Sequence, residues 1–386
     1  MKKITLGLIT LFSLPTLAQW TVVPSGTTGE IDAIHFVDSQ LGYCGGGFVN
    51  LRKTTNGGAS WTTLSTQKIR DFSFVDNTFG YAASVVGTSM AKTIDGGNTW
   101  ANFTPPTSNS LWAVSATNST TAYFVGTGGV LWKTSNGGTS VSVLNSGTTE
   151  QLNDIVFISP TIGMIIGEST GIRRTTNSGL SWSVVNATTS LTEMCFVNTN
   201  VGYAVGSNGK IVKTIDGGLT WTLLVTNSTA HLQGVHFFDI NNGLAVGLSG
   251  KILFTNDGGV TWNLQNSGLT SHLRDVRMLS ATKAIVVGDS GKILKNDNIT
   301  LLGTEEFGID NDISIYPNPT SSIVNIKSGY SINSIVISDI TGNVVFESKN
   351  TNNTDLILDI NNYASGIYFA NISNEKGNII KKIIKI

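Results

Sequence analysis

An eight-residue motif that occurs six times is the strongest constraint on how this 386-residue chain can fold. Each copy begins with Thr, has Asp or Asn at its third position and Gly at its fifth, and closes with Trp in five of the six copies. The copies end at positions 61, 100, 141, 182, 221 and 262, which gives a period of 39 to 41 residues. A fixed period of about 40 residues is typical of repeat architectures, and four short strands per repeat predict the blades of a β-propeller.

The motif is expected to be a tight turn between two strands. An Asp or Asn at its third position can accept hydrogen bonds from nearby backbone N–H groups. The constant Gly suggests a positive φ angle, and the closing Trp should pack against the neighbouring blade. Because three of the six copies carry uncharged Asn, we expect a structural role and no metal or acid–base chemistry. The residues given this role are Asn56, Gly58, Trp61, Asp95, Gly97, Trp100, Asn136, Gly138, Asn177, Gly179, Trp182, Asp216, Gly218, Trp221, Asp257, Gly259 and Trp262.

Seven inner strands are predicted, which makes seven blades. β-branched and aromatic residues fill the runs between turn-forming segments such as Ser207–Gly209 and Asp289–Gly291. The inner strands are expected to begin near Ile31, Ile69, Leu111, Leu152, Leu191, Leu232 and Leu273.

The two ends of the repeat region predict how the ring closes. The seventh repeat reaches Lys295 and then lacks the motif, while Trp20–Val23 precedes the first repeat as an orphan fourth strand. This strand should complete the last blade and leave no open edge. The third repeat departs from the pattern, with Val141 in place of Trp and a pair of tryptophans at Trp112 and Trp132.

The motif resembles that of the Asp-box (BNR) propellers. With the preceding segment Gly209–Thr214, the repeat is most similar to propellers of the photosystem II assembly factor type, over about residues 20 to 296. The resemblance implies that the boxes lie on the face away from the binding site. It implies no activity, since the box occurs in sialidases, xyloglucanases and propellers without enzymatic function.

The candidate ligand site is a ring of varied residues, one position after each inner-strand start. Their neighbours two and four positions further along stay apolar, so variation at the ring could mark a ligand-facing rim at the mouth opposite the boxes. Solvated loop ends that are free to vary are an equal alternative. The ring consists of Asp32, Arg70, Trp112, Asn153, Thr192, Gln233 and Arg274.

Other polar positions favour structural roles. A basic residue that precedes each box is expected to lay its aliphatic stem beside the Trp; the column comprises Lys53, Lys92, Lys133, Arg174, Lys213 and Lys295. Four acids at one blade position are interpreted as structural, namely Asp71, Asp154, Glu193 and Asp275. The histidines lack metal-ligand spacing, although His35 and His236 occupy equivalent positions.

No catalytic residues, metal or cofactor are predicted. A retaining glycosidase needs two carboxylates about 5 Å apart, and the ring offers only Asp32 outright. The sequence contains neither a Gly-rich phosphate loop nor a nucleophile elbow. We therefore expect no enzyme, with a glycan-cleaving enzyme as the alternative.

The N-terminus and the composition favour export. Residues 1–18 are typical of a signal peptide: Lys2 and Lys3 precede an apolar run, and a small-residue cleavage site lies before Gln19. Charged residues make up 13% of the chain and the net charge is −1, which argues against nucleic acid as a partner. No later stretch approaches the length of a transmembrane helix. Cys44 and Cys195 lie in different repeats and are expected to be free and buried.

The period stops in a predicted linker at residues 297–312. Residues 313–386 then show about seven short strands, which imply a small β-sandwich. Those after the first are expected at 322–326, 332–338, 343–347, 355–359, 366–370 and 379–383. The fold class is therefore all-β, a seven-bladed β-propeller (residues 19–296) plus a small C-terminal β-sandwich.

The tail resembles the C-terminal sorting domain of type IX secretion cargo. The resemblance rests on Tyr316–Pro319, Asp339–Gly342, the run from Leu358 to Tyr368 and the basic end at Lys381–Lys385. It implies a Gram-negative host, passage across the outer membrane, and removal of the domain or attachment to surface polysaccharide. An appended carbohydrate-binding or adhesion sandwich is the alternative.

These observations predict a secreted or surface-displayed binding module that reaches the surface through the periplasm. Its expected partners are the type IX machinery, through residues 313–386, and an unknown protein or glycan at the propeller face. A periplasmic assembly factor for a membrane complex is a further alternative.

Overall fold

The computed structural model describes residues 20–47, 49–84, 90–186, 190–299, 313–339, 343–374 and 377–386, with backbone alone for 350–352 and 377–380. The predicted signal peptide and most of the predicted linker lie outside the described residues. The chain divides into two compact units, residues 1–301 and 302–386, and each is described by itself.

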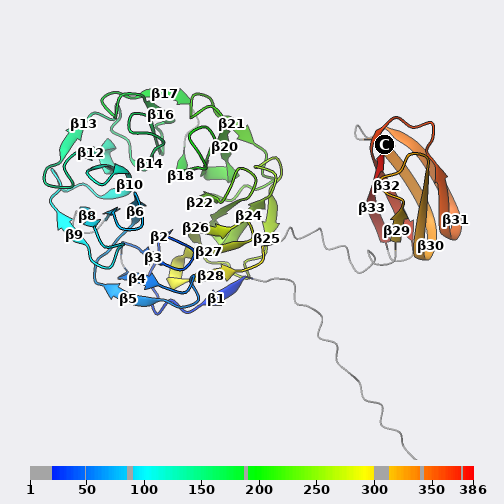
Figure 1. The fold of residues 1–386 in the computed structure, drawn as a ribbon, viewed down its shortest axis with the longest axis horizontal. Coiled ribbons are helices and arrows are strands. Elements are labelled where there is room, and N and C mark those ends of the chain that lie inside the picture. Colours follow the sequence, from blue (N-terminus) through cyan, green and yellow to red (C-terminus); the bar gives the residue numbers. More distant parts are fainter. Residues whose placement is uncertain are drawn as a thin grey trace, which may run out of the picture. The chain divides into compact units, whose positions relative to one another are not determined.

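The first unit is a ring of seven four-stranded antiparallel sheets (Figure 1). Blade 1 consists of β2 (Ala33–Phe36), β3 (Gly42–Gly45), β4 (Leu51–Thr54) and β5 (Thr62–Ser65). Blade 2 consists of β6 (Asp71–Phe74), β7 (Gly80–Ala83), β8 (Met90–Thr93) and β9 (Ala101–Phe103). Blade 3 consists of β10 (Leu111–Asn118), β11 (Thr121–Gly126), β12 (Leu131–Thr134) and β13 (Ser142–Leu144).

The other blades repeat this order. Blade 4 consists of β14 (Leu152–Phe157), β15 (Gly163–Gly167), β16 (Ile172–Thr175) and β17 (Ser183–Asn186). Blade 5 consists of β18 (Leu191–Phe196), β19 (Gly202–Gly206), β20 (Ile211–Thr214) and β21 (Thr222–Leu224). Blade 6 consists of β22 (Leu232–Phe237), β23 (Gly243–Gly247), β24 (Lys251–Thr255) and β25 (Asn263–Gln265). Blade 7 contains β26 (Leu273–Ser280), β27 (Lys283–Gly288) and β28 (Ile293–Asn296).

The seventh blade takes its fourth strand from the other end of the propeller. Strand β1 (Thr21–Val23) pairs antiparallel with β28, with Thr21 opposite Lys295 and Val23 opposite Ile293. Trp20, directly before β1, is 6% exposed and packs with residues of blade 6 such as Leu244 and Phe254. The predicted ring closure is confirmed, and Trp20 supplies the closing Trp that the seventh repeat lacks.

The apolar core is divided among the spaces between consecutive blades. Trp262 of blade 6, for example, is 8% exposed and packs with Tyr203 of blade 5, while its edge meets the ring of Phe237 in its own blade at 5.9 Å between centroids. The Trp therefore lies in the interface with the preceding blade, as the sequence predicts. In blade 3, Trp132 is 1% exposed and fills the equivalent core with Val141 packed against it, so the second Trp compensates for the missing one.

The boxes are closed by hydrogen bonds of their polar side chains. In blade 5, the Asp216 carboxylate accepts the N–H groups of Leu219 at 3.0 Å and Thr220 at 2.9 Å. The Thr214 hydroxyl donates to Asp216 and accepts the N–H of Gly218 at 3.0 Å. Gly218 has φ of 79°, a backbone conformation that Gly adopts at low cost. The expected positive φ at this position is confirmed.

The second unit is a small β domain with its own apolar core, formed by residues such as Ile326, Ile335 and Ile372. Its five strands are β29 (Ile313–Tyr316), β30 (Ile323–Asp339), β31 (Val344–Asp359), β32 (Gly366–Asn374) and β33 (Gly377–Lys385). They form one hydrogen-bonded sheet that curls into a half-barrel around the core. There are fewer strands than the sequence suggests, because β30 and β31 each join two of the expected segments. No helix in the described parts of either unit is long and apolar enough to cross a membrane.

Candidate functional site

The inner strands of the seven blades enclose a cavity of about 690 Å³ on the propeller axis. All seven residues of the predicted ring line this cavity, although they are up to 242 residues apart in the sequence (Asp32 to Arg274). They lie where the inner strands begin. The boxes follow the third strands, which run parallel to the inner ones, so they lie at the opposite end of the propeller.

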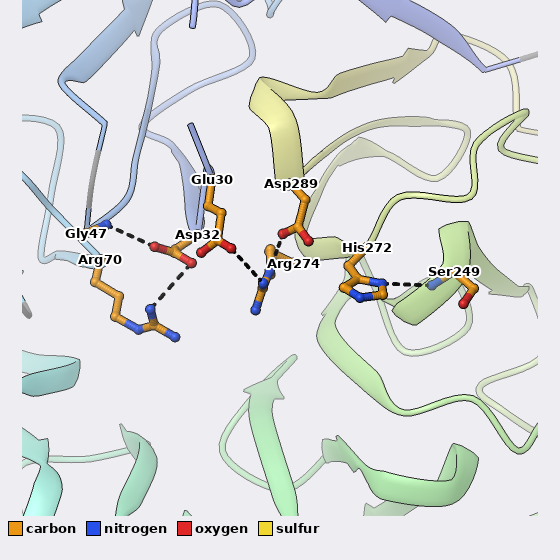
Figure 2. A network of polar contacts seen from close by, with 8 residues as sticks. All are labelled: Glu30, Asp32, Gly47, Arg70, Ser249, His272, Arg274 and Asp289. Atoms are coloured by element: carbon orange, nitrogen blue, oxygen red, sulfur yellow. Dashed lines mark hydrogen bonds and ion pairs between the residues drawn. The ribbon is translucent and has the colours of Figure 1, made fainter. Parts of the chain in front are cut away.

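Arg70 is held on one side of the mouth by a stacked ring and a carboxylate. Its guanidinium lies 3.8 Å from the centroid of the Trp112 ring, and one of its terminal nitrogens lies 3.4 Å from Asp32 Oδ1. Asp32 is fixed in turn by the N–H of Gly47, which donates to Oδ2 at 2.9 Å (Figure 2). Burial lowers the pKa of Arg70, an effect that the charge of Asp32 opposes and that of Arg274 reinforces.

Arg274 is held by two carboxylates. Its Nε donates to Asp289 Oδ1 at 2.7 Å and its Nη2 to Glu30 Oε1 at 3.3 Å. Burial by itself would lower the pKa of Arg274, but the hydrogen bond with Asp289 and the charges of Asp289, Glu30 and Asp32 together raise it. Arg70 and Arg274 point toward the same central space (Figure 2).

Two ring residues join neighbouring blades. The Asn153 amide donates to the carbonyl of Leu191 in blade 5 at 2.7 Å, and the Thr192 hydroxyl donates to that of Leu232 in blade 6 at 2.7 Å. These two side chains therefore serve the scaffold as well as lining the cavity. Gln233 also lines it, and no described residue contacts its amide through a hydrogen bond, so this amide is available to a ligand.

Below the mouth, three aspartates bind the backbone of adjacent inner strands. Each accepts the N–H of the residue that follows it and the N–H of the equivalent residue in the next blade. Asp71 does so with Phe72 at 2.8 Å and Val114 at 2.7 Å. Asp154 repeats this with Ile155 and Met194, and Asp275 with Val276 and Ile34. These acids supply acceptors to strand edges that have no further strand beside them.

The fourth acid of this set breaks the pattern. The three aspartates bind six of the seven equivalent backbone N–H groups of the inner strands. The seventh N–H belongs to Val235 in blade 6, and Glu193 is the acid of the preceding blade. Within the described residues, the Glu193 carboxyl makes no hydrogen bond to Val235 or to any other group. Its side chain is one methylene longer than Asp and lines the cavity. The structural role predicted for the four acids is thus confirmed by contacts for three of them only.

These carboxyl groups hold their protons to unusually high pH. Burial raises the pKa of Asp154 to about 7 and that of Asp275 to about 6. Burial also raises the pKa of Asp71 and Glu193 well above their usual values, and the neighbouring carboxylates add to it. The protonation of Asp154 and Asp275 is therefore expected to change within the physiological pH range.

A third layer of side chains lies deeper. Arg277 Nη2 lies 2.6 Å from His35 Nδ1, and His236 Nδ1 accepts the N–H of Met278 at 3.3 Å. Burial, reinforced by the charge of Arg277, lowers the pKa of both histidines well below the usual value. Cys195 also lines this layer, and both cysteines are free thiols. In the described part of the chain, no group of three or more His, Cys, Asp or Glu has the geometry to hold a metal ion.

The basic residues before the boxes act through their charged ends. Lys213 Nζ donates to the Gly258 carbonyl in the next blade's box at 2.7 Å, and Arg174 Nε donates to that of Gly217 at 3.0 Å. Four of the six basic residues make such a hydrogen bond to the box of the next blade, so contacts support the predicted structural role for these four.

Comparison with known proteins assigns the two units separately. Residues 314–386 match the family of secretion system C-terminal sorting domains. We call residues 313–386 the sorting domain from here on; its presence supports secretion and a location at the cell surface. None of the curated proteins is significantly similar in sequence.

The propeller is similar to several solved structures. YCF48 bound to D1 peptide has a TM-score of 0.60 and 22% identity, covering 74% of this chain and 99% of that one. YCF48 from Cyanidioschyzon merolae has a TM-score of 0.60 and 18% identity, with 72% and 98% covered. The GH74 enzyme of Niastella koreensis has a TM-score of 0.60 and 16% identity, with 95% and 74% covered. At these identities the similarity shows the propeller fold alone.

Some residues of the site were not among those predicted. Glu30, Glu168 and Arg277 line the cavity, and Asp289 holds Arg274. Glu168 and Asp289 follow the last residue of the second strand in their blades, so an alignment of that position would have revealed them. Arg277 lies four positions after its inner-strand start, where His35 and His236 stand in other blades.

Proposed function

We propose that this protein is a secreted or surface-displayed binding module, and that the mouth of the axial cavity is its ligand site. One observation carries the proposal: the seven ring positions, which differ in residue type from blade to blade, all line a single cavity of about 690 Å³. A cavity of this size with a few positioned polar groups is typical of ligand sites.

The mouth has the preorganisation that binding requires. Arg70 and Arg274 are fixed by Trp112, Asp32, Glu30 and Asp289, so a ligand would meet rotamers that are already set. The free amide of Gln233 offers both donor and acceptor atoms.

Three of the mouth carboxylates are bound to other groups of the protein, which favours binding over glycan cleavage. Glu30 and Asp289 are committed to Arg274, and Asp32 to Arg70 and Gly47. A carboxylate whose oxygens are held by an arginine or a backbone N–H is not free to pass a proton to a glycosidic oxygen. The structural neighbours suggest two ligand classes, since YCF48 was solved with a D1 peptide and a GH74 protein of Xanthomonas campestris is a xyloglucanase. A protein or a glycan is therefore proposed.

The test is a binding screen of the mature chain on glycan and peptide arrays, alongside fluorogenic glycosidase substrates. We expect a ligand whose binding falls on Gln233→Ala and Trp112→Ala. Val260→Ala is the matched control, because Val260 is 74% exposed in the blade 6 box. Equal loss in the control, or turnover of any substrate, would contradict the proposal.

A further inference from the structure

The cavity is lined by more acidic than basic side chains. The carboxyl groups are those of Glu30, Asp32, Asp71, Asp154, Glu168, Glu193 and Asp275, and the guanidinium groups are those of Arg70, Arg274 and Arg277. Seven minus three leaves an excess of four carboxyl groups. Burial raises the pKa of four of these groups, and an entering cation would favour their ionised forms, so the excess suits a positively charged ligand.

The positive charges are already partnered within the protein. Arg274 is bound by Glu30 and Asp289, Arg70 lies on Trp112 beside Asp32, and Arg277 lies against His35. A ligand anion at the mouth would therefore compete with carboxylates that already occupy the arginines.

Two of the carboxyl groups have no partner. Asp71, Asp154 and Asp275 bind two backbone N–H groups each, Asp32 binds Gly47, and Glu30 binds Arg274. Among the described residues, the side-chain carboxyl groups of Glu168 and Glu193 make neither a hydrogen bond nor an ion pair. Glu168 lies at the mouth of blade 4, and Glu193 lies one layer deeper in blade 5.

The role of the Glu193 position is known from other blades, where an Asp at the same position binds backbone N–H groups. An Asp here would reach the backbone of the next blade, as Asp71, Asp154 and Asp275 do. Glu carries its carboxyl past that backbone and into the cavity. The Glu193 carboxyl is half-buried in the cavity wall and has no hydrogen-bond partner among the described residues, so it is available to a ligand.

We propose that Glu193 is the counter-ion for a primary ammonium group, contributed by a lysine side chain of a polypeptide bound over the mouth. The inference rests on the proposed function and names the chemistry of its ligand. Lysine fits because its ammonium is a compact charge on a flexible four-carbon stem. Glu193 follows its rim residue Thr192 directly, so a stem of this length can pass the rim and reach the carboxyl.

Binding should release a proton. Burial and the carboxyl groups of Asp275, Asp154 and Asp71 raise the pKa of Glu193, while Arg277 lowers it; His35 and His236 lie in the layer below. An entering ammonium group favours the ionised form of Glu193 and so lowers this pKa. The proton passes to the buffer, and a merely structural glutamate would give no such release.

The experiment is a calorimetric titration of the full chain with n-butylammonium, in buffers of different ionisation enthalpy, with n-butanol as the neutral comparison. We expect butylammonium to bind with proton release and butanol not to bind. Glu193→Gln should weaken binding about tenfold or more, as for a lost charge-assisted hydrogen bond. Glu150→Gln removes the same charge from an exposed site outside the cavity and should have less than about a twofold effect.

A second variant separates binding from folding. Glu193→Asp keeps the charge but should bind the Val235 N–H, and we expect it to fold well and lose butylammonium. Equal binding of butanol, or unchanged binding in both Glu193 variants, would overturn the proposal. If glucosamine oligosaccharides bind in a way that depends on Glu193 while lysine peptides do not bind, the assignment of the ligand to a polypeptide would be overturned. A ligand that depends on Trp112 and Gln233 but not on Glu193 would leave the proposed function intact and remove this inference alone.

Discussion

The third residue of each box determines the direction of one hydrogen bond. In copies with Asn, the residue four positions later is Ser and accepts the bond: Asn56 Nδ2 donates to Ser60 Oγ at 2.9 Å. In copies with Asp that residue is Thr and donates, as Thr220 Oγ1 does to Asp216 Oδ2 at 2.6 Å. A hydroxyl can do either, so the turn closes with both kinds of side chain.

Asp216→Asn is therefore expected to be mild, and Gly218→Ala severe. Ala at 218 would have to adopt φ near 79° and place its Cβ 3.0 Å from Met164 Sδ, which should cost about 1 kcal/mol or more. Asn at 216 keeps an oxygen for the Thr220 N–H, and the Thr220 hydroxyl can turn to accept. Chemical denaturation of both variants measures the two losses. A large loss in Asp216→Asn that added metal restores would instead indicate a metal site.

A second prediction at this scale concerns Glu193 and pH. Unfolded Glu ionises near a pKa of about 4.3, whereas the native group holds its proton to higher pH. Between the two values the native state binds more protons, so this group lowers stability as the pH rises. Glu193→Gln should match the wild type at pH 4 and be more stable at pH 8, as measured by melting temperature. A stability difference that does not change with pH would contradict the raised pKa.

At the scale of elements, ring closure depends on a three-residue strand. Deleting residues 19–24 removes β1, exposes the edge of β28 and takes Trp20 from the core it shares with blade 6. We expect a lower melting temperature and aggregation in size-exclusion chromatography, because an unpaired edge is a template for pairing with other chains. Val22→Lys is the control, since this side chain is 55% exposed. A truncated protein that stays monomeric and melts like the wild type would show that β1 is dispensable.

At the scale of the whole molecule, the propeller and the sorting domain have separate apolar cores. A chain without residues 310–386 should therefore still fold its propeller. Because a signal peptide of the kind predicted at residues 1–18 leads only to the periplasm, we expect this truncated chain to accumulate there. The full-length chain should reach the surface or the medium.

Fractionation of both chains in a host with type IX secretion tests this prediction. Mass spectrometry of the exported protein would show whether the sorting domain has been removed. Equal export of the two chains would rule out a sorting role for the tail.

The repeat itself determined the fold class, the number of blades and the closing strand. These follow from local patterns: the alternation of each strand, the turn chemistry of each box and a period of about 40 residues, all of which can be read along the chain. The ring positions could be predicted for the same reason, since equivalent positions in a closed ring face the same axis. The curled sheet of the sorting domain could not be predicted as well, because β30 and β31 continue through segments whose sequence suggested the end of a strand.

Only the tertiary structure decided what each ring residue does. The side chains of Asn153 and Thr192 donate hydrogen bonds to the next blade, whereas the Gln233 amide has no such bond among the described residues. The sequences of the three inner strands do not predict this difference. The Asp275 carboxylate meets the N–H of Ile34 across 241 residues, a contact that exists only because the ring closes. Each aspartate binds the N–H groups of two inner strands, and seven strands cannot be divided into pairs. The N–H of Val235 is therefore left without an aspartate, and Glu193 occupies the position from which a fourth Asp would bind it. Such pairings depend on which groups closure brings together, and a single repeat does not contain that information.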